Sequence, residues 1–75
     1  PDETDAIQSA RVRAANALLR ADLERGIDEL LSAMQRNRRF ATGQGRDDLL
    51  RAFDLAPADS AAVAQARRRL AALLH

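Results

Sequence analysis

Apolar residues recur three and four positions apart along almost the whole chain, and this spacing restricts the fold more than any other feature. The pattern is clearest in residues 23–37, where the stripe consists of Leu23, Ile27, Leu30, Leu31 and Met34. A period near 3.6 places such residues on one face of a helix. The alternation typical of strands is absent, and β-branched residues are scarce. The sequence therefore predicts an all-α fold.

The same spacing elsewhere predicts four helices, and local signals mark their ends. Residues 1–4 supply start signals and early acidic charge for the first helix. Asp22 is a suitable N-cap for the second helix, Thr42 for the third, and Asp59 or Ser60 for the fourth. We expect helices over about residues 4–20, 23–37, 46–55 and 60–74.

The connections between these helices are short, so sequential helices should be antiparallel neighbours. A break is expected from Phe40 to Gly45, because Gly43 and Gly45 are poor helix formers, and Pro57 should end the third helix. The predicted architecture is a single domain, residues 1–75, of four antiparallel helices arranged as two stacked helical hairpins.

The expected core is small, because 17 of the 75 residues are Ala and only two are aromatic. Ala adds little buried area, so the larger apolar residues must supply most of the burial energy. Phe40 is expected to seal the junction between the hairpins. The remaining expected core residues are Leu18, Ile27, Leu30, Leu31, Met34, Leu49, Leu50, Phe53, Val63, Leu70 and Leu73.

The side chains that most catalytic and metal sites need are nearly all missing. The chain has no Cys, Lys or Tyr, and its single His is the last residue, His75. The adjacent pairs Asp28–Glu29 and Asp47–Asp48 point about 100° apart on a helix, so neither forms a facing acid–base dyad. They are interpreted as solvated or cap-proximal carboxylates. We therefore expect no enzymatic activity, no cofactor and no metal ion.

The charge balance bears on possible partners. All twelve basic residues are Arg, against eleven acidic residues, so the formal net charge is only +1. The isoelectric point of about 9.6 is high because no side chain titrates between His and Arg. A nearly neutral chain with scattered Arg residues disfavours nucleic-acid binding. A small Arg-rich nucleic-acid-binding domain is kept as the alternative function.

Cellular context is indicated by what the sequence lacks. No run approaches the roughly 18 apolar residues of a membrane span, and no signal-peptide pattern is present. A secreted chain of this size would usually carry disulfides. We therefore expect a cytoplasmic location without membrane binding. Because the first residue is Pro, we also expect the chain to be part of a longer protein.

Small residues at the expected helix crossing suggest a helical repeat. Gly26 and Leu30 match the A-x3-F spacing of the tetratricopeptide repeat, with Ala14 twelve residues before Gly26. The large consensus residues are missing, since Ala10 and Ala17 stand where Trp and Tyr would be. The first two helices are therefore interpreted as one degenerate tetratricopeptide-like repeat.

The second half contains four stretches in a fixed order: RNRRF over 36–40, GR over 45–46, LLRAFDL over 49–55 and VAQARRRLAALL over 63–74. Their order and spacing resemble the C-terminal tetratricopeptide-like domain of bacterial thioredoxin-like co-chaperones of the chaperedoxin type, which close with an R-D-R-x-F segment, a G-R-x-x-L-L-x-x-F helix and a V-A-x-x-R-R-R-L-A-x-L-L helix. The resemblance also covers the second helix, through DLE over 22–24 and IDELL over 27–31, and spans about residues 10–75. Departures include Ala21, where the family usually has Gly, and Ala66 and His75, where it usually has aromatic residues.

The resemblance implies a protein–protein interaction module that belongs to a larger chaperone. The parent chain is expected to carry an N-terminal thioredoxin-like domain. Its partners are expected to be unfolded client proteins, bound as by a holdase, or other chaperones that receive them. Any redox-active Cys would lie in that N-terminal domain, because residues 1–75 contain none.

A row of polar side chains on the first helix is the candidate binding site. The first helix of each pair lines the concave face of a tetratricopeptide array. Arg13, Asn16 and Arg20 are spaced three and four apart, so they form one row along that helix. Arg can bind a carboxylate with two hydrogen bonds, and Asn both donates and accepts. The alternative is an apolar rim formed by Ile7, Val12 and Leu19.

Two other groups of Arg residues are interpreted as structural features. In the run Arg67-Arg68-Arg69, two side chains flank the apolar face of the last helix and one points to solvent. Arg36, Arg38 and Arg39 crowd the end of the second helix, where the helix dipole favours cations. A site for an anionic partner is the alternative at both places.

Overall fold

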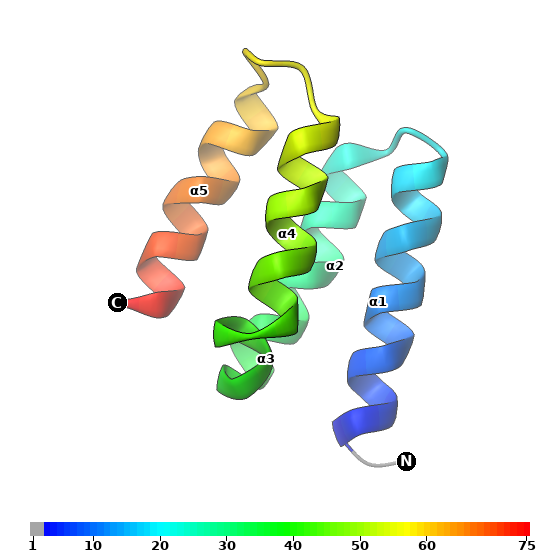
Figure 1. The fold of residues 1–75 in the computed structure, drawn as a ribbon, viewed down its shortest axis with the longest axis vertical. Helices are drawn as coiled ribbons and strands as arrows, with labels where there is room; N and C mark the ends of the chain where they lie inside the picture. The colour runs from blue at the N-terminus through cyan, green and yellow to red at the C-terminus, as the bar shows by residue number, and fades with distance from the viewer. Residues whose placement is uncertain (1–2) are drawn as a thin grey trace.

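The computed structural model describes residues 3–75, and this part of the chain is all-helical, as predicted. Residues 1 and 2, which belong to the expected start signal, lie outside the described residues. None of the described helices is long and apolar enough to cross a membrane. Figure 1 shows five helices in the described part: α1 (Glu3–Leu19), α2 (Leu23–Arg36), α3 (Arg38–Thr42), α4 (Gln44–Leu55) and α5 (Ala61–Leu74).

The four longer helices alternate in direction, and α2 is the central one (Figure 1). Each of the other helices packs against α2, whereas α1 and α4 approach each other much less closely. The last helix, α5, packs against α2 and α3 more than against α4. The two helices of the expected second hairpin, α4 and α5, are therefore not closely packed on each other. The molecule is flat, with principal extents of 37 × 30 × 14 Å.

The short helix α3 corrects the sequence prediction, which placed a break from Phe40 to Gly45. Asn37 makes this helix possible, because its side-chain oxygen accepts a hydrogen bond from the Phe40 amide at 2.9 Å. The backbone N–H of Asn37 donates to the Ala33 and Met34 carbonyls at the end of α2. One residue therefore both ends α2 and caps α3, and the chain holds five helices over residues 3–75 instead of four.

Thr42 does not cap the following helix, contrary to the prediction. Its hydroxyl donates to the Arg38 carbonyl at 3.1 Å, and the N-cap of α4 is Gly43, which has no side chain to accept a hydrogen bond. The other two predicted caps are confirmed. Asp22 accepts from the Arg25 amide at the start of α2, and the Ser60 hydroxyl accepts from the Val63 amide at the start of α5.

The turn between α1 and α2 contains a strained residue, Ala21, with φ of 61°. The Asp22 amide donates to the Ala17 carbonyl at 2.9 Å, and the Ala21 amide donates to the Leu18 carbonyl at 3.0 Å. These two bonds form a Schellman motif, which requires the left-handed conformation at this position and therefore favours Gly. The departure from Gly noted in the sequence thus falls where a β-carbon is least tolerated.

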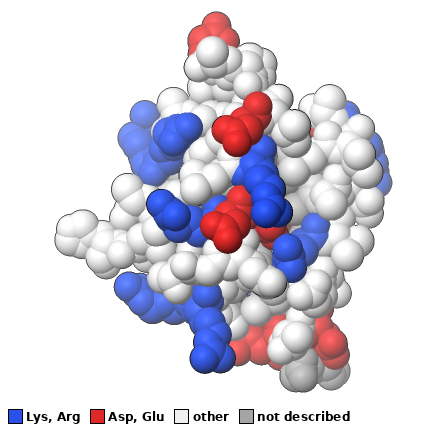
Figure 2. All heavy atoms as spheres, in the orientation of Figure 1, with Lys and Arg blue, Asp and Glu red and all other residues white. Residues whose placement is uncertain are grey.

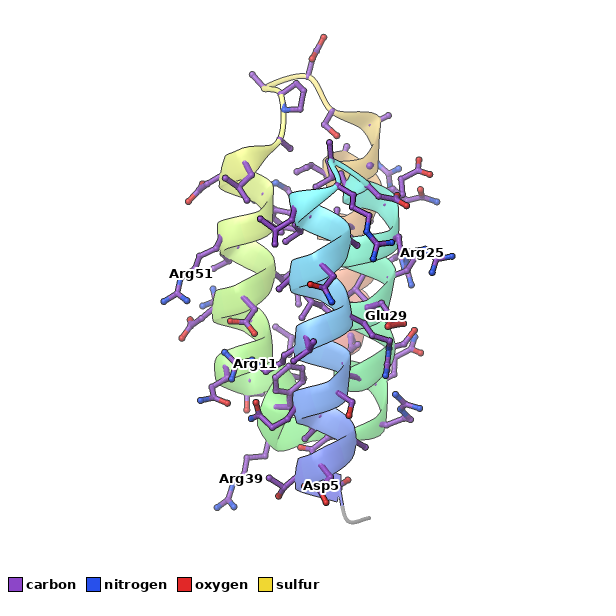
Figure 3. The ribbon with its side chains drawn as sticks, turned by 90° about the vertical axis from the view of Figure 1, so that its right-hand side faces the viewer. Asp5, Arg11, Arg25, Glu29, Arg39 and Arg51 are labelled. Carbon is purple, nitrogen blue, oxygen red and sulfur yellow. The ribbon has the colours of Figure 1, made fainter. Side chains whose placement is uncertain are left out.

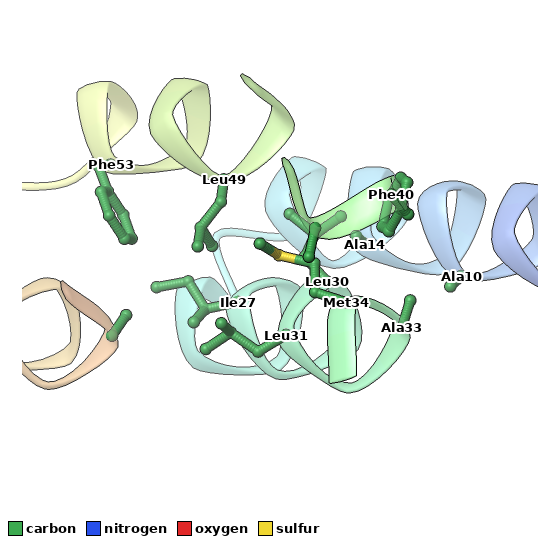
Figure 4. Packing of buried hydrophobic residues seen from close by; sticks show 12 residues of the cluster. Ala10, Ala14, Ile27, Leu30, Leu31, Ala33, Met34, Phe40, Leu49 and Phe53 are labelled. Atoms are coloured by element: carbon green, nitrogen blue, oxygen red, sulfur yellow. The ribbon is translucent and has the colours of Figure 1, made fainter. Parts of the chain in front are cut away.

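Packing around α2 confirms about half of the expected core (Figure 4). Phe40, on α3, is buried in this cluster, and its ring lies against Gly45 of α4. Expected core residues that are only partly buried lie mainly near the edges of the flat molecule: Leu18, Leu50, Val63, Leu70 and Leu73. The buried apolar residues are Ile27, Leu30, Leu31, Met34, Phe40, Leu49 and Phe53, together with Ala10, Ala14, Ala17, Ala33, Ala41, Ala52 and Ala66.

Two glycines permit close contacts that a β-carbon would block. At Gly26, a β-carbon would lie 2.9 Å from Leu18 Cδ2, which is the end of a partly exposed and flexible side chain. At Gly45, it would lie 2.7 Å from the Phe40 carbonyl oxygen and 2.8 Å from the Phe40 ring. The ring is buried and the carbonyl belongs to the backbone, so the second clash is much harder to relieve.

We expect Ala21→Gly to raise the free energy of unfolding by about 0.5–1 kcal/mol, because Gly tolerates the left-handed conformation. Chemical denaturation followed by circular dichroism measures the change. The matched control is Ala64→Gly, the same substitution at an exposed position inside α5. It should lower stability by about 1 kcal/mol. Equal destabilisation by both substitutions would contradict the strained turn.

We expect Gly45→Ala to lower the free energy of unfolding by roughly 1–3 kcal/mol, because the new methyl group overpacks the Phe40 contact. Helix propensity alone predicts the opposite sign, since Ala favours a helix over Gly by about 1 kcal/mol. Gly26→Ala is the control, since Leu18 can move aside and the expected change is smaller than for Gly45→Ala. A stabilising effect of Gly45→Ala in the same denaturation assay would refute the contact.

Candidate functional site

An apolar groove runs between α1 and α4, because these two helices pack on α2 without closing on each other. Its volume is about 320 Å³. Ala14 and Leu30 form the floor, and Ala15 and Ala52 keep the sides open because their side chains are short. The exposed apolar rims come from Val12 on α1, 59% exposed, and Leu55 on α4, 73% exposed; Leu18, Arg11, Asp48 and Arg51 complete the lining.

An ion pair between Arg11 and Asp48 closes one end of this groove. Arg11 Nε lies 2.6 Å from Asp48 Oδ2, and Arg11 Nη2 lies 3.2 Å from Asp48 Oδ1, so the pair is bidentate. Arg11 Nη1 also donates to Gln44 Oε1 at 3.3 Å. The hydrogen bond to Asp48 raises the pKa of Arg11 and outweighs the lowering effect of partial burial. Figure 3 shows Arg11 directed from α1 toward α4.

The predicted row of Arg13, Asn16 and Arg20 lies on the other flank of α1. Arg13 pairs with Glu29 of α2, which Figure 3 shows on the side of α1 away from α4. Helical periodicity places Asn16 and Arg20 along the same flank, and both are exposed. The row and the groove are therefore two separate surfaces of α1.

Three of the four carboxylates that the sequence suggested were solvated or cap-proximal take part in contacts between helices. Asp28 of α2 accepts from Arg69 of α5 at 2.7 Å, and Glu29 of α2 pairs with Arg13 of α1. Asp48 of α4 pairs with Arg11 as described above, whereas Asp47 is exposed in the first turn of α4, as interpreted from the sequence. Asp28 and Glu29 thus turn to different helices.

The basic run on α5 behaves as interpreted from the sequence. The Arg67 guanidinium lies 4.9 Å from the centre of the Phe53 ring, a cation–π contact. Arg69 binds Asp28, and Arg68 is exposed. Two of the three side chains are therefore held by the protein itself, and no continuous anionic-partner surface forms there.

The described residues contain no group of three or more His, Asp or Glu side chains that could hold a metal ion. They also contain no buried polar side-chain atom without a hydrogen-bond partner. The chemistry available at the groove is apolar contact, with guanidinium groups at its edge, and this suits binding of another polypeptide.

Sequence reasoning missed the groove and its closing ion pair. Arg11 and Asp48 are 37 positions apart, and nothing in a single sequence marks them as partners. A weak signal existed for Leu55, which is a large apolar residue shortly before Pro57, at the end of its helix. Ala15 and Ala52 look like ordinary helix-forming residues, although their small size opens the groove.

Comparison with known proteins gives one finding. A family model described as tetratricopeptide repeat matches residues 2–75, nearly the entire chain. No curated protein and no solved structure shows significant similarity to it.

We expect the Arg11–Asp48 pair to couple α1 and α4 energetically by about 1 kcal/mol, more than a typical exposed pair, because it is bidentate and partly buried. A double-mutant cycle with Arg11→Ala and Asp48→Ala, followed by denaturation, measures this coupling. The pair Arg25–Asp22, at 3.8 Å and largely exposed, is the control and should show less coupling. Coupling of the Arg11–Asp48 pair no larger than this control would contradict its role.

Proposed function

Because the chain belongs to the tetratricopeptide repeat family, whose repeats generally mediate protein–protein interaction, we propose that it is the protein-binding module of a thioredoxin-like chaperone. Its proposed ligands are unfolded client proteins or chaperones that receive them. The open apolar groove between α1 and α4 carries this proposal, since large apolar side chains are exposed there on a chain with few of them.

The chaperone context is supported by the sequence motifs of the second half. The RNRRF segment spans the junction of α2 and α3, the GR and LLRAFDL segments lie in α4, and the last segment forms most of α5. Each motif thus falls on an ordered helical element and contributes a buried residue, such as Phe40, Phe53 or Ala66. The motifs therefore pack together as one unit of the fold.

Apolar recognition in the groove explains how one module can bind many unfolded chains. An unfolded protein exposes Leu, Ile and Val side chains without a fixed sequence. An open groove with apolar rims offers them burial, worth about 1.5–3 kcal/mol for each large side chain. The row of Arg13, Asn16 and Arg20 is proposed as a second, polar contact, in which Arg20 and Asn16 are available and Arg13 would have to leave Glu29.

The groove is tested by measuring binding of a reduced and alkylated, permanently unfolded model protein by fluorescence anisotropy. Leu55→Asp should weaken binding by about tenfold, because a charge would replace an apolar contact that the bound ligand buries. Leu19→Asp is the matched comparison: Leu19 is 85% exposed, ends α1 as Leu55 ends α4, and lies outside the groove. An equal loss in Leu19→Asp would contradict specific binding in the groove and favour the exposed surface around Leu19 instead.

Two further measurements decide the polar row and the nucleic-acid alternative. Unchanged affinity and salt dependence in the Arg13→Ala, Arg20→Ala double variant would remove the row from the site. Tight binding of a labelled oligonucleotide that falls steeply between low and moderate salt would favour the nucleic-acid alternative. We expect the unfolded protein to bind with little salt dependence and the oligonucleotide to bind weakly.

A further inference from the structure

A second pocket, separate from the groove, lies at the end of the molecule where α1 begins and α3 joins α4. Its volume is about 650 Å³. Residues of the first two turns of α1 form one side, and residues 36–40, Gly43 and Gln44 form the other. Figure 2 shows basic side chains gathered over the region of α3, in the lower left of the view.

Arg36, Arg38 and Arg39 are among the residues that line this pocket. All three residues are exposed, and no ion pair joins them to another residue in the described range 3–75. Among the described residues that line the pocket, Glu3 is the single acidic one against three Arg residues. Elsewhere in the described range, Arg11 and Arg69 are held by carboxylates, whereas Arg20, Arg46 and Arg68 are exposed and have no ion pair.

The helix dipole does not account for all three of these residues. Arg36 lies in the last turn of α2, where a cation is favourable. Arg38, however, is the first residue of α3, where a cation is unfavourable. The feature that sets these three Arg residues apart is that they gather at one pocket, where an anionic ligand would balance their charge.

We propose that this pocket binds an acidic segment of a partner protein, a short stretch with two or more carboxylates beside an apolar side chain. Arg binds a carboxylate through two parallel hydrogen bonds. Gln8 and Gln44 line the same pocket, and a Gln side-chain amide can bind a peptide backbone; Ile7 is also part of the lining and is apolar.

The same features disfavour a nucleic acid as the ligand. Strong binding of a nucleic acid needs many phosphate contacts, whereas this pocket offers three cations on a chain of net charge +1. Single-stranded ligands also need an exposed aromatic ring for stacking. The only aromatic residue at the pocket, Phe40, is 5% exposed.

The inference rests on the proposed function in one respect, that the ligands of this chain are proteins. The test uses the complete 75-residue chain and a labelled acidic peptide of alternating Asp, Glu and Leu residues. A peptide of equal length with Lys in place of the acidic residues, and a single-stranded oligonucleotide of equal charge, are the comparison ligands. Anisotropy reports binding, and circular dichroism checks that each variant is folded.

The deciding comparison is between two double variants that each lower the net charge from +1 to −1. Arg38→Gln with Arg39→Gln removes two charges at the pocket and should weaken binding of the acidic peptide by about tenfold or more. Arg25→Gln with Arg68→Gln removes two exposed charges elsewhere and should change it less than about twofold, because such charges are largely screened by salt. The Lys peptide should not bind.

Three results would overturn the inference: no binding of the acidic peptide, equal losses in the two double variants, or tighter binding of the oligonucleotide than of the peptide. Leu55→Asp separates this inference from the proposed groove. If it leaves acidic-peptide binding intact while the unfolded protein binds normally, the pocket stands and the groove proposal fails. If Leu55→Asp weakens binding of the unfolded protein, but Arg38→Gln with Arg39→Gln leaves binding of the acidic peptide unchanged, the groove proposal stands and the pocket proposal fails.

Discussion

The close approach of α1 to α2 through small side chains is the contact on which the rest of the structure depends. Ala10, Ala14 and Ala17 are buried on α1, and Gly26 on α2 leaves no room for a β-carbon beside Leu18. Because α1 contacts α2 mainly through small residues, the large apolar residues of α2 can pack against the helices that follow. Phe53, Leu49 and Phe40 pack around them (Figure 4). A central helix in a thin molecule is the consequence.

Alanine contacts bury little area, so they fix the distance between helices better than their orientation. Three ion pairs between helices supply the missing orientation, and each of the three joins a different pair of helices. Arg11 links α1 to α4, Arg13 links α1 to α2, and Arg69 links α5 to α2. The planar guanidinium of Arg is suited to this role because it fixes the geometry of its partner. Arg residues, which are the only basic residues other than His75, thus help to orient the helices of a chain with a small core.

The features that could be predicted from the sequence are those that depend on nearby residues. Helix periodicity, the Asp22 cap and the central stripe of α2 involve neighbours within a turn or two, and the structure confirms them. The extra helix α3 was missed because Gly43 and Gly45 suggested a break, whereas Gly45 is needed for its contact with Phe40. The groove could not be predicted, because it depends on how far α1 stands from α4, and that distance is set by tertiary packing.

The groove between α1 and α4 and the pocket lined by Arg36, Arg38 and Arg39 are neighbours. The side chain of Arg11 lies between them. Arg11 lines the groove, while its hydrogen-bond partner Gln44 lines the pocket. A single extended polypeptide that occupied both surfaces would therefore place its apolar residues along α1 and α4 and its carboxylates beyond Arg11, near α3. Arg11 is already paired with Asp48, so it would separate the two surfaces and would not bind a carboxylate of the ligand. If both proposals hold, the order of apolar and acidic residues in a ligand, in addition to its composition, would determine how well this small flat domain binds it.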